Sequence, residues 1–214
     1  MCNRYQAQGI EAEFEPGSRG RVLRNLLGIR RVREMGQRES EALLAVTQRL
    51  IDETSMDKRF TADDIRNMHR LWLEDIYLWA GQYRQVNIAK DGFMFAVAGQ
   101  VERLMRKLEQ GPLSEFTPCH FNTIEDQARA LAVVHSELIL IHPFRDGNGR
   151  CARLLAVLMG LQAGLPALDF SGVRGKEKQR YIAAIHAGLG GDFAPMLGVF
   201  RRIIERTLRS EGVT

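Results

Sequence analysis

The chain has 214 residues, which is long enough for one domain with a substantial core and short for two. Hydrophobic residues make up 45% and charged residues 26%, proportions typical of a soluble globular protein. The sequence contains no long apolar run and its N-terminal segment lacks the apolar centre of a secretory signal, so we expect a cytoplasmic protein without a membrane span.

Cysteine and histidine residues are few and scattered along the chain. The cysteines include no C-x-x-C pair, and no two histidines have the i,i+4 spacing of a helical metal site. This pattern is typical of reduced thiols, and it argues against a disulfide framework or a zinc centre. The residues are Cys2, Cys119 and Cys151, with His69, His120, His135, His142 and His186.

Positive charge is concentrated near the N-terminus of a chain whose net charge is +4. Seven arginines and a single acid, Glu34, lie between Arg19 and Arg38. Apolar residues lie between these arginines, which favours a solvated helix face, and the other interpretation is a patch for an acidic partner. The segment has neither interleaved aromatic residues nor a DNA-binding motif, so we do not expect nucleic acid as a partner.

The first part of the chain is predicted to hold an irregular arm and two helices. Proline and glycine interrupt any periodicity over residues 1–20. Apolar residues recur with a period near 3.6 over residues 36–53, which predicts a helix. A second helix is expected from Thr61, where Asp64 three residues later forms a variant of the capping box, to Gly81.

Residues 82–97 break the helical pattern and predict a β-hairpin. The segment QYRQVNIAKDGFMFAV has strand-forming residues before Asp91-Gly92 and alternating aromatic residues after it. An Asp-Gly pair in this setting is a strong signal for a two-residue hairpin turn. Because an isolated hairpin is marginally stable in water, it should lie against helices or await a partner strand.

The remainder of the chain returns to helical periodicity. Thr123 with Asp126 resembles a capping arrangement, and Asp192 is predicted to cap the last helix. The whole sequence therefore predicts an all-α protein, a compact bundle of seven or eight helices with one β-hairpin. The further helices are expected over residues 98–110, 123–141, 150–164, 175–187 and 192–209.

The segment HPFRDGNG lies between two of these helices and leads the chain into a helix N-terminus. Pro143 cannot continue the preceding helix, and the next helix is expected from Arg150, after the glycines. Unpaired N–H groups and the positive end of the helix dipole make such a terminus an anion site. Gly147 and Gly149 can adopt positive φ and let the backbone approach a phosphate closely.

Charged and titratable side chains accompany the same loop. Arg150 and Arg153 are three residues apart, so both could grip phosphate oxygens from one side of the helix. Asp146 is a hard oxygen ligand for Mg²⁺ on those phosphates, and His142 is a base that titrates near neutral pH. The alternative is a polar corner between two helices, but a corner does not require all of these residue types together.

The loop resembles a known family signature. Residues 142–153, HPFRDGNGRCAR, match the Fic motif H-x-F-x-[D/E]-G-N-G-R-x-x-R at every fixed position. WAGQYRQVNIAKDGFMF resembles the Fic flap hairpin, and PGSRGRVLRNLLGI and YIAAIHAGLGGDFAPMLGVF resemble segments before and after the motif. The resemblance covers nearly the whole chain. It implies an N-terminal arm at 1–20, a Fic domain at 21–206 with its flap at 83–96, and the end of a C-terminal inhibitory helix at 207–214.

The resemblance implies a Fic fold and the transfer of AMP from ATP to a Tyr, Ser or Thr hydroxyl of a target protein. His142 would be the base that deprotonates this hydroxyl, and Asp146 would hold Mg²⁺ on the α- and β-phosphates. Phe144 would be the buried anchor of the loop. The implied phosphate-binding residues are Gly147, Asn148 and Gly149 in the cradle, with Arg150 and Arg153 on the β- and γ-phosphates.

The resemblance also implies a docking surface and a place for the adenine. The flap would hold an extended stretch of the target as an added strand, which would explain an otherwise isolated hairpin. Tyr181 either borders the adenine pocket or packs in the core. Because Fic domains often self-associate, a homo-oligomer is a further expectation. The predicted docking residues of the flap are Val86, Asn87, Ile88 and Lys90.

Other activities are alternatives to AMP transfer. Toxin-like Fic kinases replace the second motif glycine with lysine, whereas this chain keeps Gly149, so AMP transfer is favoured over phosphate transfer. Removal of AMP from modified targets is another alternative. A catalytically silent module whose basic N-terminal region binds a partner is the third, but the complete motif argues against it.

The C-terminal segment TLRSEG resembles the Fic inhibitory motif [S/T]-x-x-x-E-[G/N]. Thr207 and Glu211 are four residues apart and would share one face of a continuing helix. The resemblance implies that Glu211 pairs with Arg153 and keeps the γ-phosphate from binding productively. The other interpretation is a frayed, charged tail, but its place after a full Fic domain favours inhibition.

Overall fold

The computed structural model describes residues 6–7 and 13–212. Its contacts divide the chain into two units, and each unit is assembled from segments that are far apart in the sequence. The first unit comprises Met1–Glu53, Ala62–Met105 and Ile141–Cys151, and the second comprises Thr54–Thr61, Arg106–Leu140 and Ala152–Thr214.

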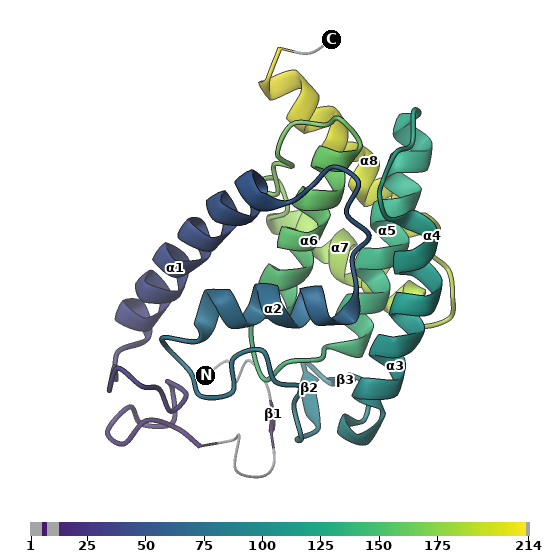
Figure 1. The fold of residues 1–214 in the computed structure, drawn as a ribbon. Helices are drawn as coiled ribbons and strands as arrows, with labels where there is room; N and C mark the ends of the chain where they lie inside the picture. Colours follow the sequence, from purple (N-terminus) through teal and green to yellow (C-terminus); the bar gives the residue numbers. More distant parts are fainter. Residues whose placement is uncertain (1–5, 8–12, 213–214) are drawn as a thin grey trace. The chain divides into compact units, whose positions relative to one another are not determined.

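The predicted all-α class with one hairpin is confirmed, and Figure 1 shows the helices in chain order. Over the described residues the helices are α1 (Val32–Glu53), α2 (Ala62–Leu73), α3 (Val101–Leu108), α4 (Ser114–Phe116), α5 (Ile124–Ile141), α6 (Asn148–Gln162), α7 (Gly175–Gly188) and α8 (Ala194–Ser210). A 3₁₀ turn, Ala98–Gln100, leads into α3, and a π-helical turn, Glu109–Leu113, separates α3 from α4. None of the described helices is both long and apolar enough to cross a membrane.

Helices α1 and α2 pack against each other in the first unit. Ile65, Met68 and Trp72 recur at helical spacing on α2 and are buried. The helix ends at Leu73, so the prediction that it continues to Gly81 is wrong. The backbone N–H of Gly81 donates to His69 Nδ1 at 2.9 Å, whereas a continuous helix would separate these residues by about 18 Å. The chain therefore folds back on α2.

The predicted hairpin is present in the first unit and is shorter than expected. Strand β2 (Ile88–Lys90) pairs with β3 (Phe93–Met94), and both turn residues, Asp91 and Gly92, have positive φ, as a type I′ turn requires. The arm that was predicted to be irregular adds a third strand, β1 (Gln6–Ala7), which pairs antiparallel with β2. The strand order is β1-β2-β3, so β2 is bonded on both sides.

The second unit is built around helices α5 to α8, and α7 packs on α8. The predicted cap of α5 is confirmed, because the N–H of Asp126 donates to Thr123 Oγ1 at 3.1 Å. At the start of α8 Phe193 holds the N-cap position, but Asp192 still accepts the N–H of Ala194 through its side chain. Local sequence signals therefore predict these helix starts to within about two residues.

Candidate active site

The loop between α5 and α6 carries the motif, and its backbone turns sharply at both ends. His142 has a φ of +51°, in the left-handed region that residues other than glycine rarely adopt. Gly147 has a φ of +82°. Helix α6 then begins at Asn148, two residues earlier than predicted, so Asn148 and Gly149 belong to its first turn.

Asn148 holds the loop in shape with its side chain. Its Oδ1 accepts the backbone N–H of Phe144 at 2.8 Å, and its Nδ2 donates to the backbone carbonyl of Phe144, also at 2.8 Å. Asn148 is buried, so these bonds form away from water. The side chain predicted to line the phosphate cradle therefore closes the loop, and the backbone N–H of Asn148 is the group left for a phosphate.

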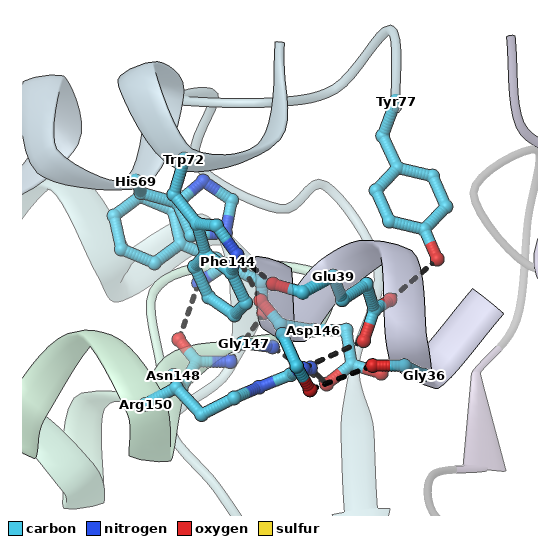
Figure 2. A network of polar contacts seen from close by, with 11 residues as sticks. Gly36, Glu39, His69, Trp72, Tyr77, Phe144, Asp146, Gly147, Asn148 and Arg150 are labelled. Atoms are coloured by element: carbon cyan, nitrogen blue, oxygen red, sulfur yellow. Dashed lines mark hydrogen bonds and ion pairs between the residues drawn. The ribbon is translucent and has the colours of Figure 1, made fainter. Parts of the chain in front are cut away.

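Buried rings support the loop from α2, as Figure 2 shows. Phe144 is fully buried, as expected, and stacks on the imidazole of His69 with 3.8 Å between ring centroids. His69 Nδ1 accepts the N–H of Gly81, so its proton lies on Nε2, which donates to the carbonyl of Asp146 at 3.1 Å. Burial lowers the pKa of His69 to about 3, so the ring is neutral at pH 7, with Nδ1 as the acceptor and Nε2 as the donor.

The two motif glycines have different surroundings. A Cβ on Gly147 would lie 2.6 Å from Trp72 Cζ3, so both the positive φ and the close ring exclude a side chain. Gly149 does not use the positive φ that we expected, and a Cβ there would meet no atom within 4 Å. The fold itself therefore requires glycine at position 147 but leaves open space at position 149.

The first turn of α6 has the donors of an anion site. Among the hydrogen bonds of the described residues, the backbone N–H groups of Asn148 and Gly149 have no acceptor. This is the usual condition of N–H groups at a helix start, where the helix dipole also favours negative charge. The side chain of Arg150 follows them, about one-fifth exposed.

Arg150 is held by Glu39 of α1, a residue that the sequence did not indicate. Arg150 Nη1 donates to Glu39 Oε2 at 2.6 Å, and the guanidinium carbon lies 4.4 Å from the centroid of the Trp72 ring. Glu39 Oε1 accepts the hydroxyl of Tyr77 at 2.7 Å. Burial, together with the Glu39 charge, raises the pKa of Tyr77, so this hydroxyl remains a donor. The arginine is thus fixed in direction while part of it stays accessible.

A signal for Glu39 was present in the pattern of α1. Met35 and Val46 are buried on this helix, and Glu39 lies four residues after the first and seven before the second, on the same face. A carboxylate on a buried helix face requires a partner, because desolvation of a lone charge is costly. The identity of that partner depends on a contact across 111 residues, which helical spacing does not reveal.

Asp146 lies beside this arginine and is one-fifth exposed through its side chain. Its Oδ1 accepts the N–H of Gly147, and the same oxygen is 3.7 Å from Arg150 Nη2. No group of three or more metal-ligating His, Cys, Asp or Glu side chains occurs in the described part of the chain. A single carboxylate suits Mg²⁺, which commonly binds one or two carboxylates together with substrate phosphates and water.

The predicted docking residues of the flap are only partly accessible. The side chains of Val86 and Ile88 are buried, so they cannot contact a target. Asn87 is exposed, but its Oδ1 accepts the N–H of Ala98 at 2.8 Å. Lys90 is half-buried and pairs with Phe93 across the hairpin. Any docking on this hairpin would therefore rely mainly on backbone groups.

Arg153 and Tyr181 belong to the second unit. Tyr181 Oη is 2.6 Å from His135 Nε2, and His135 Nδ1 lies 3.2 Å from the carbonyl of Ala152. Burial, reinforced by the charge of Arg153, lowers the pKa of His135 to about 3, and burial raises the pKa of Tyr181 to about 12. The hydroxyl of Tyr181, a half-buried residue, thus shares a hydrogen bond with a neutral imidazole.

The residues predicted to form the inhibitory motif lie at the end of α8. Thr207 is buried, and its Oγ1 accepts the N–H of Asp169 at 2.9 Å and donates to the carbonyl of Ile203. Glu211 is exposed at the C-cap of the helix. Within the described chain no ion pair joins Glu211 to Arg153, so the predicted inhibitory pair stays a prediction.

Comparisons with known proteins agree with the geometry of this site. A model of the Fic/DOC family matches residues 59–159. The chain is 30% identical over 187 residues to protein adenylyltransferase VbhT of Bartonella schoenbuchensis, a match that covers 87% of this chain. The chain spans only 38% of the length of VbhT.

A solved structure and a shorter relative extend the comparison. The N-terminal Fic domain of a VirB-translocated Bep effector protein with bound ADP, from Bartonella quintana, superposes with a TM-score of 0.70 at 25% identity, covering 89% of this chain and 92% of that one. Probable protein adenylyltransferase y4lH of Sinorhizobium fredii is 30% identical over 139 residues, 65% of this chain. Because that match covers 70% of y4lH, the chain belongs to the Fic/DOC family.

Proposed function

We propose that this protein transfers AMP from ATP to a Tyr, Ser or Thr hydroxyl of a target protein. The observation that carries the proposal is the α5–α6 loop, where His142 is followed by the carboxylate of Asp146 and the guanidinium of Arg150 at a helix start. Relatives that are 30% identical to this chain are named protein adenylyltransferase or probable protein adenylyltransferase, and one similar domain is described with bound ADP.

The reaction needs positioning and charge neutralisation more than covalent chemistry by the protein. His142 would take the proton of the target hydroxyl as its oxygen bonds to the α-phosphorus of ATP. The bond between the α-phosphorus and the bridging oxygen breaks, and pyrophosphate leaves with the electron pair. The N–H groups of Asn148 and Gly149 would hold phosphate oxygens at the start of α6.

The charged residues of the motif would neutralise the phosphate charges of ATP. Arg150 would neutralise the β-phosphate, and Arg153 keeps the role on the γ-phosphate that the family resemblance implies. Asp146 would hold Mg²⁺ on the α- and β-phosphates; when bound, the ion would neutralise charge on these oxygens.

The proposal also covers the regulation, the cellular location and the oligomeric state of the protein. Glu211 would restrain Arg153 and so limit productive binding of the γ-phosphate, and its exposed place at the end of α8 supports a switchable contact. The protein would act in the cytoplasm, which accords with the free thiols of Cys119 and Cys151. Homo-oligomerisation, expected from the family, is part of the same proposal.

Incubation with Mg²⁺ and ATP labelled at the α-phosphate, followed by intact-mass spectrometry, tests the activity. We expect a mass gain of one AMP on the protein or on proteins of a bacterial lysate, and no gain with His142→Ala. A gain of one phosphate would favour the kinase alternative. The absence of any gain, in both the wild type and Glu211→Gly, would favour a silent module.

A matched pair of variants tests the regulation. Glu211→Gln should increase labelling several-fold because it removes the restraining charge on Arg153. Glu205→Gln removes another carboxylate of α8, which is half-buried and lies beside Arg201, and should leave labelling unchanged. Equal labelling by both variants and the wild type would exclude Glu211 as the inhibitor.

A further inference from the structure

The side chain of Arg84 joins the flap hairpin to the start of the catalytic loop. It is almost completely buried, and its Nε donates to the carbonyl of His142 at 2.7 Å. Nη1 donates to the carbonyl of Val86 at 2.7 Å, and Nη2 donates to that of Ala96 and, at 3.3 Å, to that of Ile141. Val86 precedes β2 and Ala96 follows β3, so one guanidinium binds both ends of the hairpin, the last residue of α5 and the first residue of the loop.

A second contact joins the hairpin to the histidine ring itself. Phe95 stacks on the imidazole of His142 with 3.7 Å between centroids and 17° between planes. The ring of Phe95 is supported in turn by Phe93, whose ring meets it edge-on at 5.3 Å, and by a backbone bond from its N–H to the carbonyl of Ile88. The imidazole is therefore packed against the part of the chain that was predicted to dock a target.

The backbone of His142 needs such support. Its φ of +51° lies in a region that costs a residue with a Cβ free energy and persists only where surrounding contacts fix it. Arg84 bonds to the carbonyls on both sides of this φ angle, and Phe95 packs on the side chain. These contacts lie within the first unit and come from one hairpin.

We propose that Arg84 and Phe95 are positioning residues that hold His142 in its left-handed conformation and fix it to the hairpin. This rests on the proposed function of His142 as the base. A base must lie within about 2.6–3.2 Å of the proton that it takes, and a misplacement of about 1 Å can reduce a rate about 100-fold. With both residues in place, a target strand on the hairpin meets a base whose position is set by the same hairpin.

If Arg84 and Phe95 position His142, their substitution should reduce AMP transfer without weakening ATP binding. The bonds of Arg84 described above lead to the hairpin and to the carbonyls of Ile141 and His142, and Phe95 stacks on His142, whereas the phosphates would bind at the first turn of α6. Phe95→Leu should therefore reduce self-labelling from α-labelled ATP about 100-fold while the Kd for ATP, measured by calorimetry, stays within about twofold. Phe95→Tyr keeps the stacked ring and should retain most of the transfer.

Arg84→Lys keeps the charge but cannot form the several hydrogen bonds of the guanidinium. If the variant folds, we again expect reduced self-labelling with an unchanged Kd for ATP. The matched control is Met94→Leu, which changes an exposed neighbour of Phe95 on β3. Melting temperatures of all variants identify any that fail to fold, and the Phe95 variants decide the outcome if Arg84→Lys is among them. Loss of ATP affinity in parallel with transfer would overturn the proposal, as would full transfer by Phe95→Leu.

A spectroscopic measurement separates this proposal from the proposed function. The stacked Phe95 ring should shift the His142 ring protons upfield in the NMR spectrum, and Phe95→Leu should abolish this shift and alter the backbone shifts of His142. If the wild type transfers no AMP, the proposed function fails, and these shifts still decide whether the hairpin holds His142. Unchanged backbone shifts in Phe95→Leu would contradict the positioning role.

Discussion

Gly147 and Gly149 are separated by one residue, yet the structure gives different reasons for each. Gly147 has a φ of +82°, and the Trp72 ring lies where its Cβ would be. Gly149 faces open space and has no positive φ. The first glycine serves the fold. Neither the backbone conformation nor the neighbouring atoms require glycine at position 149, which leaves close approach of a ligand as the physical use of its missing side chain.

Alanine at these two positions should separate folding from binding. Gly147→Ala should lower the free energy of unfolding by about 2–4 kcal/mol, because the new methyl group clashes with Trp72 at an unfavourable φ. Gly149→Ala should leave the stability unchanged or raise it by up to about 1 kcal/mol, since alanine is the better helix former. Its Kd for ATP should rise at least tenfold, because the methyl group fills the space that a phosphate would enter.

Urea denaturation and calorimetric ATP titration of both variants check this expectation. Normal ATP affinity in Gly149→Ala would show that phosphate does not approach this residue. Normal stability in Gly147→Ala would contradict the close contact with Trp72.

Glu39 is the residue whose removal should most weaken the support of Arg150. Glu39→Ala leaves the Tyr77 hydroxyl without its acceptor and removes the carboxylate that is hydrogen-bonded to Arg150, which keeps only the longer contact with Asp146. We expect a loss of about 2–3 kcal/mol in the free energy of unfolding, below the value for a fully buried pair because Arg150 can reach water. Glu41→Ala, on the exposed face of α1, should cost less than about 0.5 kcal/mol by the same urea denaturation. Equal losses in both variants would exclude a special role for Glu39.

At the scale of elements, features with local causes were predictable from the sequence. The Asp91-Gly92 turn and the helix start at Thr123 each depend on residues within a few positions. The end of α2 was not predictable in this way, because Gly81 returns to bond His69 across twelve residues. Strand β1 was missed for the same reason, since two residues carry no periodicity and their pairing depends on a distant strand.

Strand β1 changes what the hairpin offers to a target. Because β1 lies on the outer edge of β2, a target strand must either displace it or add to β3. If displacement is the route, Gln6→Pro with Ala7→Pro should raise kcat/KM for a protein target several-fold, since proline removes the N–H donors of β1. The KM for ATP should not change.

The control for this variant is Gln6→Thr with Ala7→Val, which favours the strand and should lower or maintain kcat/KM. Labelling kinetics at limiting target concentration distinguish the two. Identical values for both double variants would mean that β1 does not compete with the target.

At the scale of the whole molecule, each unit holds a buried histidine whose pKa is lowered, and this predicts a pH dependence of stability. Burial lowers the pKa of His69 and of His135 to about 3, whereas the unfolded chain titrates near 6.5. Between these values the unfolded state binds more protons. The stabilisation is therefore complete above about pH 6.5 and is lost as the pH falls towards 3, by about 1.4 kcal/mol per pH unit for each histidine.

Urea denaturation at pH 7.5, 6.0 and 5.0 measures this slope. His135→Gln should reduce the slope by about 1.4 kcal/mol per pH unit, because the variant lacks one of the two buried imidazoles. A stability that is constant from pH 7.5 to 5.0 would contradict the burial of both neutral rings.

The candidate site was predictable where its chemistry is contiguous in the sequence. The motif between His142 and Arg153 predicted the loop and, to within two residues, the start of the following helix from residue types alone. The supporting residues were not predictable, because Glu39 and Arg84 reach the loop across 111 and 58 residues. Such contacts depend on how helices pack, and periodicity indicates a buried face without naming its partner.

The 111-residue separation of Glu39 and Arg150 also has a consequence for the order of folding. Closing so long a loop has an entropic cost that must precede the favourable contact, which slows folding. During synthesis α1 and α2 emerge long before the α5–α6 loop. Glu39, His69 and Trp72 can therefore contact the loop and Arg150 only after the later part of the chain has been synthesised. A chain that stops before Ile141 would contain the flap and the supporting residues but not the loop that we propose to bind phosphate, so the proposed AMP transfer should appear only once the nascent chain extends past the motif.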